Sequence, residues 1–180
     1  MKKVELIRSR LNPLVVDDVD TDQIIPARFL KTIGRAGLGA NLFADWRGGR
    51  FDASNEARLL LAGNNFGCGS SREHAVWALT DFGFEAVIAR SFADIFRSNA
   101  LKNGLVPVAV GEDVHRYLVA NPGVEVSVDV ARAVVVMPDG EEVAFPLDPF
   151  ARQCVTQGID ELEYLRRHET AIAVWEARHG

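Results

Sequence analysis

The sequence contains little cysteine. Only Cys68 and Cys154 occur among its 180 residues. Two thiols are too few for a disulfide framework or for the four ligands that an iron–sulfur cluster usually takes. The four histidines show no ligand-like spacing with one another or with the cysteines. We therefore expect this chain to bind no metal, so that any metal needed for chemistry has to come from elsewhere.

Long apolar runs and an excess of positive charge are also absent. No run approaches the roughly 20 apolar residues of a membrane-spanning helix, and the first residues, Met1–Leu6, lack the apolar stretch of a secretory signal. The net charge of −5 and the lack of a basic stripe argue against a nucleic-acid binder. We expect a cytoplasmic protein that acts on neither membranes nor nucleic acids.

The middle of the chain alternates strands and helices, within one domain expected to span residues 1–180. Buried strands are predicted at Leu59–Ala62, Glu85–Ala89 and Leu105–Val110. Helices are predicted at Ser70–Phe82 and Phe92–Lys102, the second with Phe92, Ile95 and Phe96 facing inward. Two successive strand–helix–strand units imply a parallel sheet with right-handed crossovers.

The segments before this unit are less regular. Short strands are predicted at Val4–Arg10 and Pro13–Val16, followed by an acidic loop at Asp17–Asp22. That loop has the carboxylates of a cation site but lacks the EF-hand pattern, so a solvated turn is the simpler interpretation. A helical turn is predicted at Ile24–Thr32, and five glycines mark Ile33–Gly49 as a mobile or irregular loop.

The last third of the chain changes to antiparallel strands and helices. A short helix at Val114–Ala120 precedes β-segments at 124–130, 133–137 and 142–145, with a hairpin turn at Asp139-Gly140. A helical segment begins at about residue 148, where Asp148 and Pro149 form a typical helix start. A terminal helix is predicted at Asp160–Ala177, with an apolar side made by Leu162, Leu165, Ile172 and Trp175. The whole predicts an α/β domain with both parallel and antiparallel strands.

The segment Asn64–His74 is the most informative part of the chain. Two glycines flank Cys68, and two serines and an arginine then open the predicted helix. The first N–H groups of a helix have no partner inside it, so they favour an anion such as a serine alkoxide or a carboxylate. Arg72 would add a two-pronged carboxylate binder at the same place.

Simpler interpretations of this segment exist. Ser70-Ser71-Arg72-Glu73 fits a capping box, in which Ser70 would only start the helix. Gly67-x-Gly69 partly matches a dinucleotide-binding fingerprint, but Arg72 occupies the place of the third glycine. The lysine and the hydroxyl residue of a P-loop are absent. Capping and anion binding both stay open on the pattern alone.

Three motifs in this order resemble one family. They are Asp20-Thr21-Asp22-Gln23-Ile24-Ile25-Pro26 with Phe29-Leu30-Lys31, Asn65-Phe66-Gly67-Cys68-Gly69-Ser70-Ser71-Arg72-Glu73-His74-Ala75, and Ser91-Phe92-Ala93-Asp94-Ile95-Phe96 with Asn103-Gly104-Leu105-Val106-Pro107. The chain resembles the small subunits of bacterial 3-isopropylmalate dehydratases, also called isopropylmalate isomerases. The likeness runs from about Val15 to the terminal helix and extends to the swivelling C-terminal domain of aconitase.

The resemblance implies a fold, a partner and a reaction. The fold would be the aconitase-like swivelling domain, with three β/β/α layers. The partner would be a large subunit that carries a [4Fe-4S] cluster, in a heterodimer or higher heteromer. The complex would act on a small dicarboxylic hydroxy acid, as a hydro-lyase that interconverts 2-isopropylmalate and 3-isopropylmalate through isopropylmaleate in leucine biosynthesis. This chain alone would be inactive.

The resemblance also implies roles for individual residues. Ser70 matches the aconitase serine that removes the proton beside a carboxylate, and the N–H groups of Ser71 and Arg72 would stabilise its alkoxide. The Arg72 side chain would bind a substrate carboxylate. Asp22 matches an active-site aspartate, although a structural turn is an alternative. Further candidates for substrate contact near the turn are Thr21, Asn65 and Gly69.

Substrate choice is predicted to depend on the loop after Phe29-Leu30-Lys31. Ile33 occupies the place where aconitase has an arginine for a third carboxylate, and an apolar residue there suits an isopropyl group. Arg35 would restore a charge if the loop were shifted. The alternatives are therefore a related hydratase acting on homoaconitate, citraconate or dimethylmaleate, a stand-alone anion-binding module, and a purely structural partner.

Overall fold

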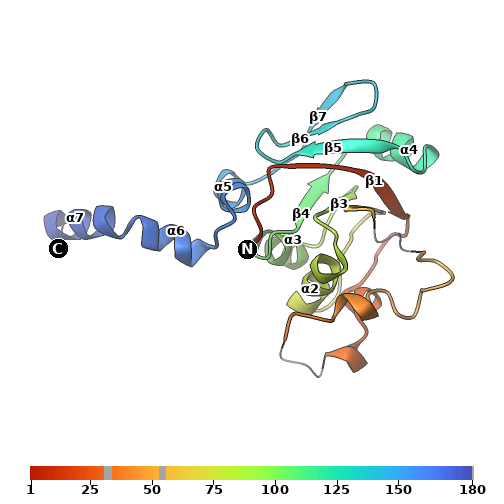
Figure 1. Cartoon of the computed structure of the whole chain (residues 1–180), viewed down its shortest axis with the longest axis horizontal. Helices are drawn as coiled ribbons and strands as arrows, with labels where there is room; N and C mark the ends of the chain where they lie inside the picture. The colour runs from red at the N-terminus through yellow and green to blue at the C-terminus, as the bar shows by residue number, and fades with distance from the viewer. Residues whose placement is uncertain (31–33, 53–55, 180) are drawn as a thin grey trace.

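The computed structural model describes residues 1–30, 34–52 and 56–179. Its centre is a seven-stranded sheet in the order β4-β3-β2-β1-β5-β6-β7 (Figure 1). The strands are β1 (Leu6–Leu14), β2 (Leu59–Ala62), β3 (Ala86–Ala89), β4 (Val106–Ala109), β5 (Glu125–Asp129), β6 (Val134–Val136) and β7 (Glu142–Ala144). Neighbours from β1 to β4 are parallel and the other pairs are antiparallel, which confirms the predicted α/β domain with a mixed sheet.

Strand β1 joins the two halves of the sheet. Its first half, Leu6–Arg10, pairs antiparallel with β5, and its second half, Leu11–Leu14, pairs parallel with β2. The prediction of two short strands at Val4–Arg10 and Pro13–Val16 is therefore wrong. Pro13 does not end the strand, because pairing with β5 has already stopped at Arg10 and no ladder on that side needs its missing N–H.

The parallel half is buried on both faces. Helices α2 (Glu73–Phe82) and α3 (Asp94–Lys102) cover one face, where Leu60 and Val87 belong to the same apolar cluster as Val76, Leu79 and Phe96. The intervening strand residues, such as Leu59 and Ile88, belong to a second cluster with Leu118 of helix α4 (Glu112–Ala120). Strands buried on both faces read as continuous apolar runs, which is why β2 was predicted with its observed bounds.

The connection from β1 to β2 packs against α2. It contains helix α1 (Thr21–Ile24) and two 3-10 turns, η1 (Ala27–Phe29) and η2 (Gly39–Asn41), in place of the single helical turn predicted at Ile24–Thr32. The Gly39 N–H donates to the Asp81 carboxylate at 2.8 Å, and Leu42 and Phe43 are fully buried. The irregular segment predicted after residue 33 thus contributes side chains to the core.

Helix α5 (Pro149–Gln157) starts and ends where the sequence predicted. The Asp148 carboxylate accepts the Ala151 N–H at 2.8 Å, Pro149 is the first helical residue, and Gly158 closes the helix in a left-handed conformation. These three residues satisfy the exposed backbone groups at the two helix ends.

The terminal helix differs from its prediction. Two helices occupy it, α6 (Glu161–Arg167) and α7 (Glu169–His179), with His168 between them. Figure 1 shows this C-terminal arm, residues 161–179, projecting away from the sheet. The residues of its predicted apolar side are exposed, with Leu162 at 58% and Trp175 at 62% of full exposure. No helix in the described part of the chain is long and apolar enough to cross a membrane.

Candidate functional site

The turn that carries Ser70 is fastened to the segment that follows β1. Three backbone hydrogen bonds join them: Asp18 N–H to the Asn64 carbonyl at 2.9 Å, Gly67 N–H to the Val19 carbonyl at 2.8 Å, and Thr21 N–H to the Cys68 carbonyl at 3.0 Å. Both segments leave the carboxyl ends of neighbouring parallel strands. They therefore meet at the same edge of the sheet, where open α/β sheets commonly bind ligands.

Gly67 is required by both conformation and space. Its φ of +78° lies in the left-handed region, and a Cβ built there would overlap the Phe96 ring of α3. Gly69 also has a positive φ, +85°, and lies against Asp20. These two residues turn the chain from β2 toward the start of α2.

The predicted capping box at Ser70–Glu73 is absent. Helix α2 begins at Glu73, and Arg72, in extended conformation, is the residue before it with no side-chain cap. The Arg72 N–H donates instead to the Ser70 carbonyl at 2.8 Å. A capping box does form one motif earlier, where Asp20 and Gln23 exchange both bonds at the start of α1.

The first and second motifs meet through two side-chain contacts. The buried Thr21 hydroxyl donates to the Ser70 carbonyl at 3.0 Å, with Thr21 only 2% exposed. The Arg72 guanidinium forms an ion pair with the Asp22 carboxylate. Only one nitrogen of Arg72 is used in that pair, so the remaining N–H groups can face a ligand. Residues about 50 positions apart in sequence thus surround Ser70.

Backbone N–H groups at the start of α2 are available for an anion. Among the described residues, no acceptor is present for the N–H groups of Ser71 and Glu73. The Arg72 N–H, predicted as a donor to the anion, is already bonded to Ser70. Of the two predicted donors, the Ser71 N–H is therefore unbonded within the described part of the chain and the Arg72 N–H is not, while the likewise unbonded Glu73 N–H belongs to the first residue of α2.

The third motif supports the same helix from behind. The Trp77 indole N–H donates to the Asn103 side-chain oxygen at 2.9 Å, and the Asn103 amide donates to the Glu73 carboxylate at 3.0 Å. His74 packs its ring on Trp77, with 4.7 Å between ring centroids. Glu73 is therefore held by Asn103, which no local pattern around Glu73 would indicate.

A depression of about 580 Å³ lies beside Ser71 and Arg72. It is lined by Leu30, Ser71, Arg72, Glu73, His74, Trp77, Ile95 and Asn99. Ile95, predicted to face inward, is 54% exposed and contributes an apolar wall. The guanidinium of Arg35 lies over the Trp77 ring at 4.9 Å. Ile33, the predicted specificity residue, lies outside the described residues.

Known proteins share both the sequence and the fold of this chain. Residues 49–113 match the family model of the aconitase C-terminal domain. A 3-isopropylmalate dehydratase small subunit of Chloroflexus aggregans is 47% identical, over 99% of this chain and 95% of its own length. One of Anaeromyxobacter sp. (strain K) is 51% identical, over 98% of each chain. The chain belongs to the family of 3-isopropylmalate dehydratase small subunits.

The solved structures agree with this family. A crystal structure of 3-isopropylmalate dehydratase from Methanocaldococcus jannaschii aligns with a TM-score of 0.70 at 29% identity, over 97% of this chain and 99% of that one. The predicted aconitase-like fold and the predicted dehydratase family are both confirmed. Because the relatives are named as small subunits, a large subunit is implied as partner.

The Cys68 thiol takes part in a hydrogen bond beside the turn of Ser70. Burial, with the carboxylates of Asp20 and Asp18 nearby, raises the pKa of its thiol. The thiol donates to the Asp18 carbonyl at 3.3 Å, whereas a metal ligand must be a thiolate. Cys154 lies buried on α5, also with a raised pKa, chiefly because of burial. No group of three metal-ligating side chains occurs within the described ranges.

Proposed function

We propose that this chain completes the active site of a 3-isopropylmalate dehydratase by closing over a cluster-bearing large subunit. The complex would interconvert 2-isopropylmalate and 3-isopropylmalate through isopropylmaleate, a step of leucine biosynthesis in the cytoplasm. One observation carries the proposal: Arg72, two residues after Ser70, is paired with Asp22, and the N–H groups of Ser71 and Glu73 beside it have no acceptor among the described residues. We further propose that residues 1–180 work as one domain, with a C-terminal helical segment from about residue 148.

Ser70 is the base in this proposal. Its alkoxide removes a proton from the carbon beside a carboxylate, the electron pair of that C–H bond forms the double bond, and the hydroxyl group leaves the neighbouring carbon as hydroxide. That hydroxide and the proton held by Ser70 together make up the water that is lost, which returns Ser70 to its alkoxide. Addition of water in the opposite sense gives the isomer. A serine alkoxide is strongly disfavoured in water, so it needs donors placed beforehand. The N–H groups of Ser71 and Glu73, with the positive end of α2, supply them.

Arg72 and the residues around it bind and orient the substrate. The Arg72 guanidinium presents its remaining N–H donors to a substrate carboxylate. The ion pair with Asp22 fixes the orientation of the guanidinium from the other side. Thr21 is too buried to touch a substrate, so its role here is to position the Ser70 backbone. Gly69 and Asn65, both with positive φ, shape the turn that presents Ser70 and Arg72 to the substrate.

The cluster is assigned to the partner because the donor set of this chain does not fit it. The Cys68 thiol donates to the Asp18 carbonyl, Cys154 is buried on α5, and the two belong to no group of three metal-ligating side chains in the described ranges. When bound in the large subunit, the cluster supplies a Lewis acid for the departing hydroxyl group. The residues of this chain handle the proton and the carboxylate.

The isopropyl group fits the apolar walls beside Arg72. Leu30 and Ile95 line the depression there, and neither would bind a third carboxylate. Ile33 would add to this apolar surface. Arg35 is engaged with the Trp77 ring, which favours a dicarboxylic substrate over the tricarboxylic alternative homoaconitate.

Anaerobic reconstitution with the large subunit tests the proposal. The unsaturated product is followed from 3-isopropylmalate, from citraconate-type acids and from tricarboxylic acids, with wild type and with Ser70→Ala. We expect turnover of 3-isopropylmalate that falls by at least about 10³-fold in Ser70→Ala. Turnover of a tricarboxylic acid alone would contradict the assignment of isopropylmalate as substrate. Full activity of Ser70→Ala in a complex with an intact cluster would contradict the assignment of Ser70 as the base.

A further inference from the structure

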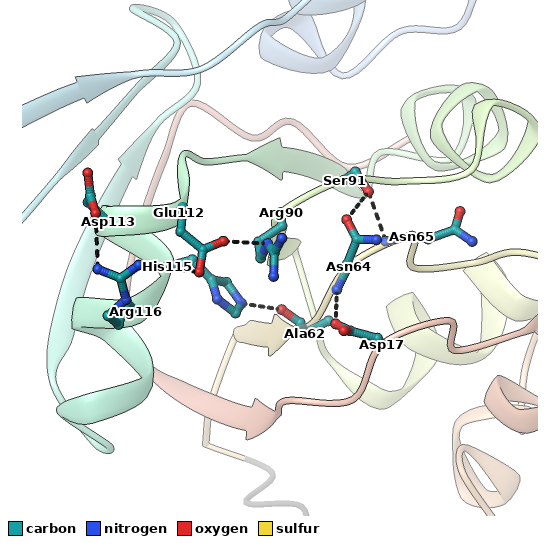
Figure 2. Close-up of polar contacts among 10 residues, drawn as sticks. All are labelled: Asp17, Ala62, Asn64, Asn65, Arg90, Ser91, Glu112, Asp113, His115 and Arg116. Carbon is teal, nitrogen blue, oxygen red and sulfur yellow. Dashed lines mark hydrogen bonds and ion pairs between the residues drawn. The ribbon is translucent and has the colours of Figure 1, made fainter.

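Ser91 lies at the exit of β3 and contacts the turn of Ser70 from the side opposite to Asp17 and Asp18. Its hydroxyl accepts the Asn65 N–H at 2.8 Å and donates to the Asn64 side-chain oxygen at 2.7 Å (Figure 2). Its carbonyl accepts the Phe66 N–H at 3.0 Å. One residue thus bonds three consecutive residues of the turn.

The turn needs this support because its backbone is unusual. Asn65 has a φ of +51°, a conformation that side-chain-bearing residues rarely adopt and that costs about 1–3 kcal/mol unless the surroundings hold it. On the far side, the Asn64 N–H donates to the Asp17 carboxylate at 2.6 Å, and the Asn65 amide donates to the Asp18 carboxylate at 2.8 Å. Ser91 and the two aspartates therefore hold Asn64 and Asn65 from both sides.

The strand ends behind Ser91 are themselves fixed by α4. His115 is buried, and its Nε2–H donates to the Ala62 carbonyl at 2.7 Å, at the end of β2. Glu112 pairs with Arg90 at 2.9 Å, at the end of β3 (Figure 2). The ends of β2 and β3 are thereby both held by α4, and this fixes the position from which the Ser91 hydroxyl bonds the turn.

We propose that Ser91 is a positioning residue for the reaction, one that sets the Asn64–Gly67 turn and through it the place of Ser70. The inference rests on the proposed function, in which Ser70 is the base. Only four residues lie between Asn65 and Ser70, and Gly67 is packed against Phe96, so a shift at Asn65 is passed along the turn. Misplacement of the alkoxide and its N–H donors lowers kcat, whereas Arg72, which is bound to Asp22, keeps binding substrate.

The test compares Ser91→Ala with a matched control in the reconstituted enzyme. Ser9 is the control because its buried hydroxyl braces the chain in the same way, accepting the Arg58 N–H at 2.9 Å and donating to the Arg10 carbonyl at 2.8 Å, at the opposite end of β2. Both variants should lower the melting temperature by about 2–4 °C. Only Ser91→Ala should lower kcat, by about 10- to 100-fold, with KM changed less than about threefold. Ser91→Thr, which keeps the hydroxyl, should restore most of kcat.

The outcomes separate the inference from the proposed function. Equal and small losses of kcat in Ser91→Ala and Ser9→Ala would make Ser91 merely structural, and so would a Ser91→Ala loss that appears in KM alone. If Ser91→Ala does not fold, Ser91→Cys and Ser91→Thr are compared with wild type, and equal kcat in all three would overturn the inference. Retained activity in Ser70→Ala, measured beside them, would instead overturn the choice of base.

Discussion

The turn around Ser70 and the C-terminal arm are held in different ways. The turn is bonded to two other parts of the sequence, the segment after β1 with Val19, Thr21 and Asp22, and the exit of β3 with Ser91. In the arm, every described side chain of α7 is exposed, and α6 contacts α5 through Phe150 and Tyr164, whose ring centroids lie 4.9 Å apart. Both regions carry a clear sequence pattern, so pattern alone does not tell which one is built into the domain.

The difference follows from what each pattern reports. Apolar spacing in a helix indicates which side avoids water, and it says nothing of what covers that side. A run of glycines and small polar residues next to a buried strand indicates a conformation that other segments must stabilise. The second kind of pattern therefore predicts long-range contacts, and the first predicts only a surface.

The largest effect on this comparison is expected from Gly67→Ala. The new Cβ would overlap Phe96 at a φ of +78°, so strain and overpacking together should cost at least about 3 kcal/mol of unfolding free energy. Gly140→Ala is the control, because its φ is +88° but nothing lies within reach of a Cβ. It should cost about 1–2 kcal/mol. Urea denaturation measures both, and equal losses would show that the turn is not tightly packed.

The next largest effect is expected from Arg72→Lys, on catalysis. Lysine cannot serve Asp22 and a substrate carboxylate with a planar fork of donors, so kcat/KM should fall by about 10- to 150-fold. Arg132→Lys is the matched change in an exposed bidentate pair with Glu142. It should change kcat/KM less than about twofold. Similar losses of kcat/KM in both variants would show that Arg72 does not bind the substrate.

The sequence predicted the fold best where local chemistry decides it. Strand β2 was predicted with the observed bounds, and Asp148 and Pro149 start α5 as expected. The terminal helix was predicted too long, because the break at His168 and the lack of any cover have no local signal. Ile95 was placed in the core on helical spacing, although only the packing of α3 against α2 shows that it is exposed.

The sequence predicted which residues come together at the candidate site better than it predicted the hydrogen bonds between them. Ser70, Arg72, Asp22 and Thr21 come together at one edge of the sheet. The capping box was wrong at Ser70, because the Arg72 N–H bonds the Ser70 carbonyl and delays the helix to Glu73. The hydrogen bonds that Ser91 makes to Asn65 and Asn103 makes to Glu73 were missed. Their partners lie 26 and 30 positions away in the sequence, and no periodic pattern relates them.

A smaller effect on stability is expected from Glu85→Gln, away from both regions. Burial alone would raise the pKa of Glu85, but hydrogen bonds from Arg58 and Lys2 outweigh it and hold that pKa below its usual 4.5. The resulting stability is present above pH 4.5 and is lost as pH falls through the lowered pKa. The variant should cost about 1–2 kcal/mol at pH 7. Urea titrations should show the gap to wild type narrowing as the pH falls below 4.5, and a gap independent of pH would contradict the pairing.

The smallest effect is expected from removing α7, by ending the chain at His168. Because the side chains of this helix are exposed, its loss should leave the unfolding free energy of the body within about 0.5 kcal/mol of wild type. Trp175→Glu in the full chain is the companion change, since it keeps the helix and alters only an exposed apolar residue. Thermal melts of both should overlay wild type. A drop of several degrees in the truncated chain alone would mean that α7 contacts the body in solution, and the arm would then belong with the turn as part of the folded unit.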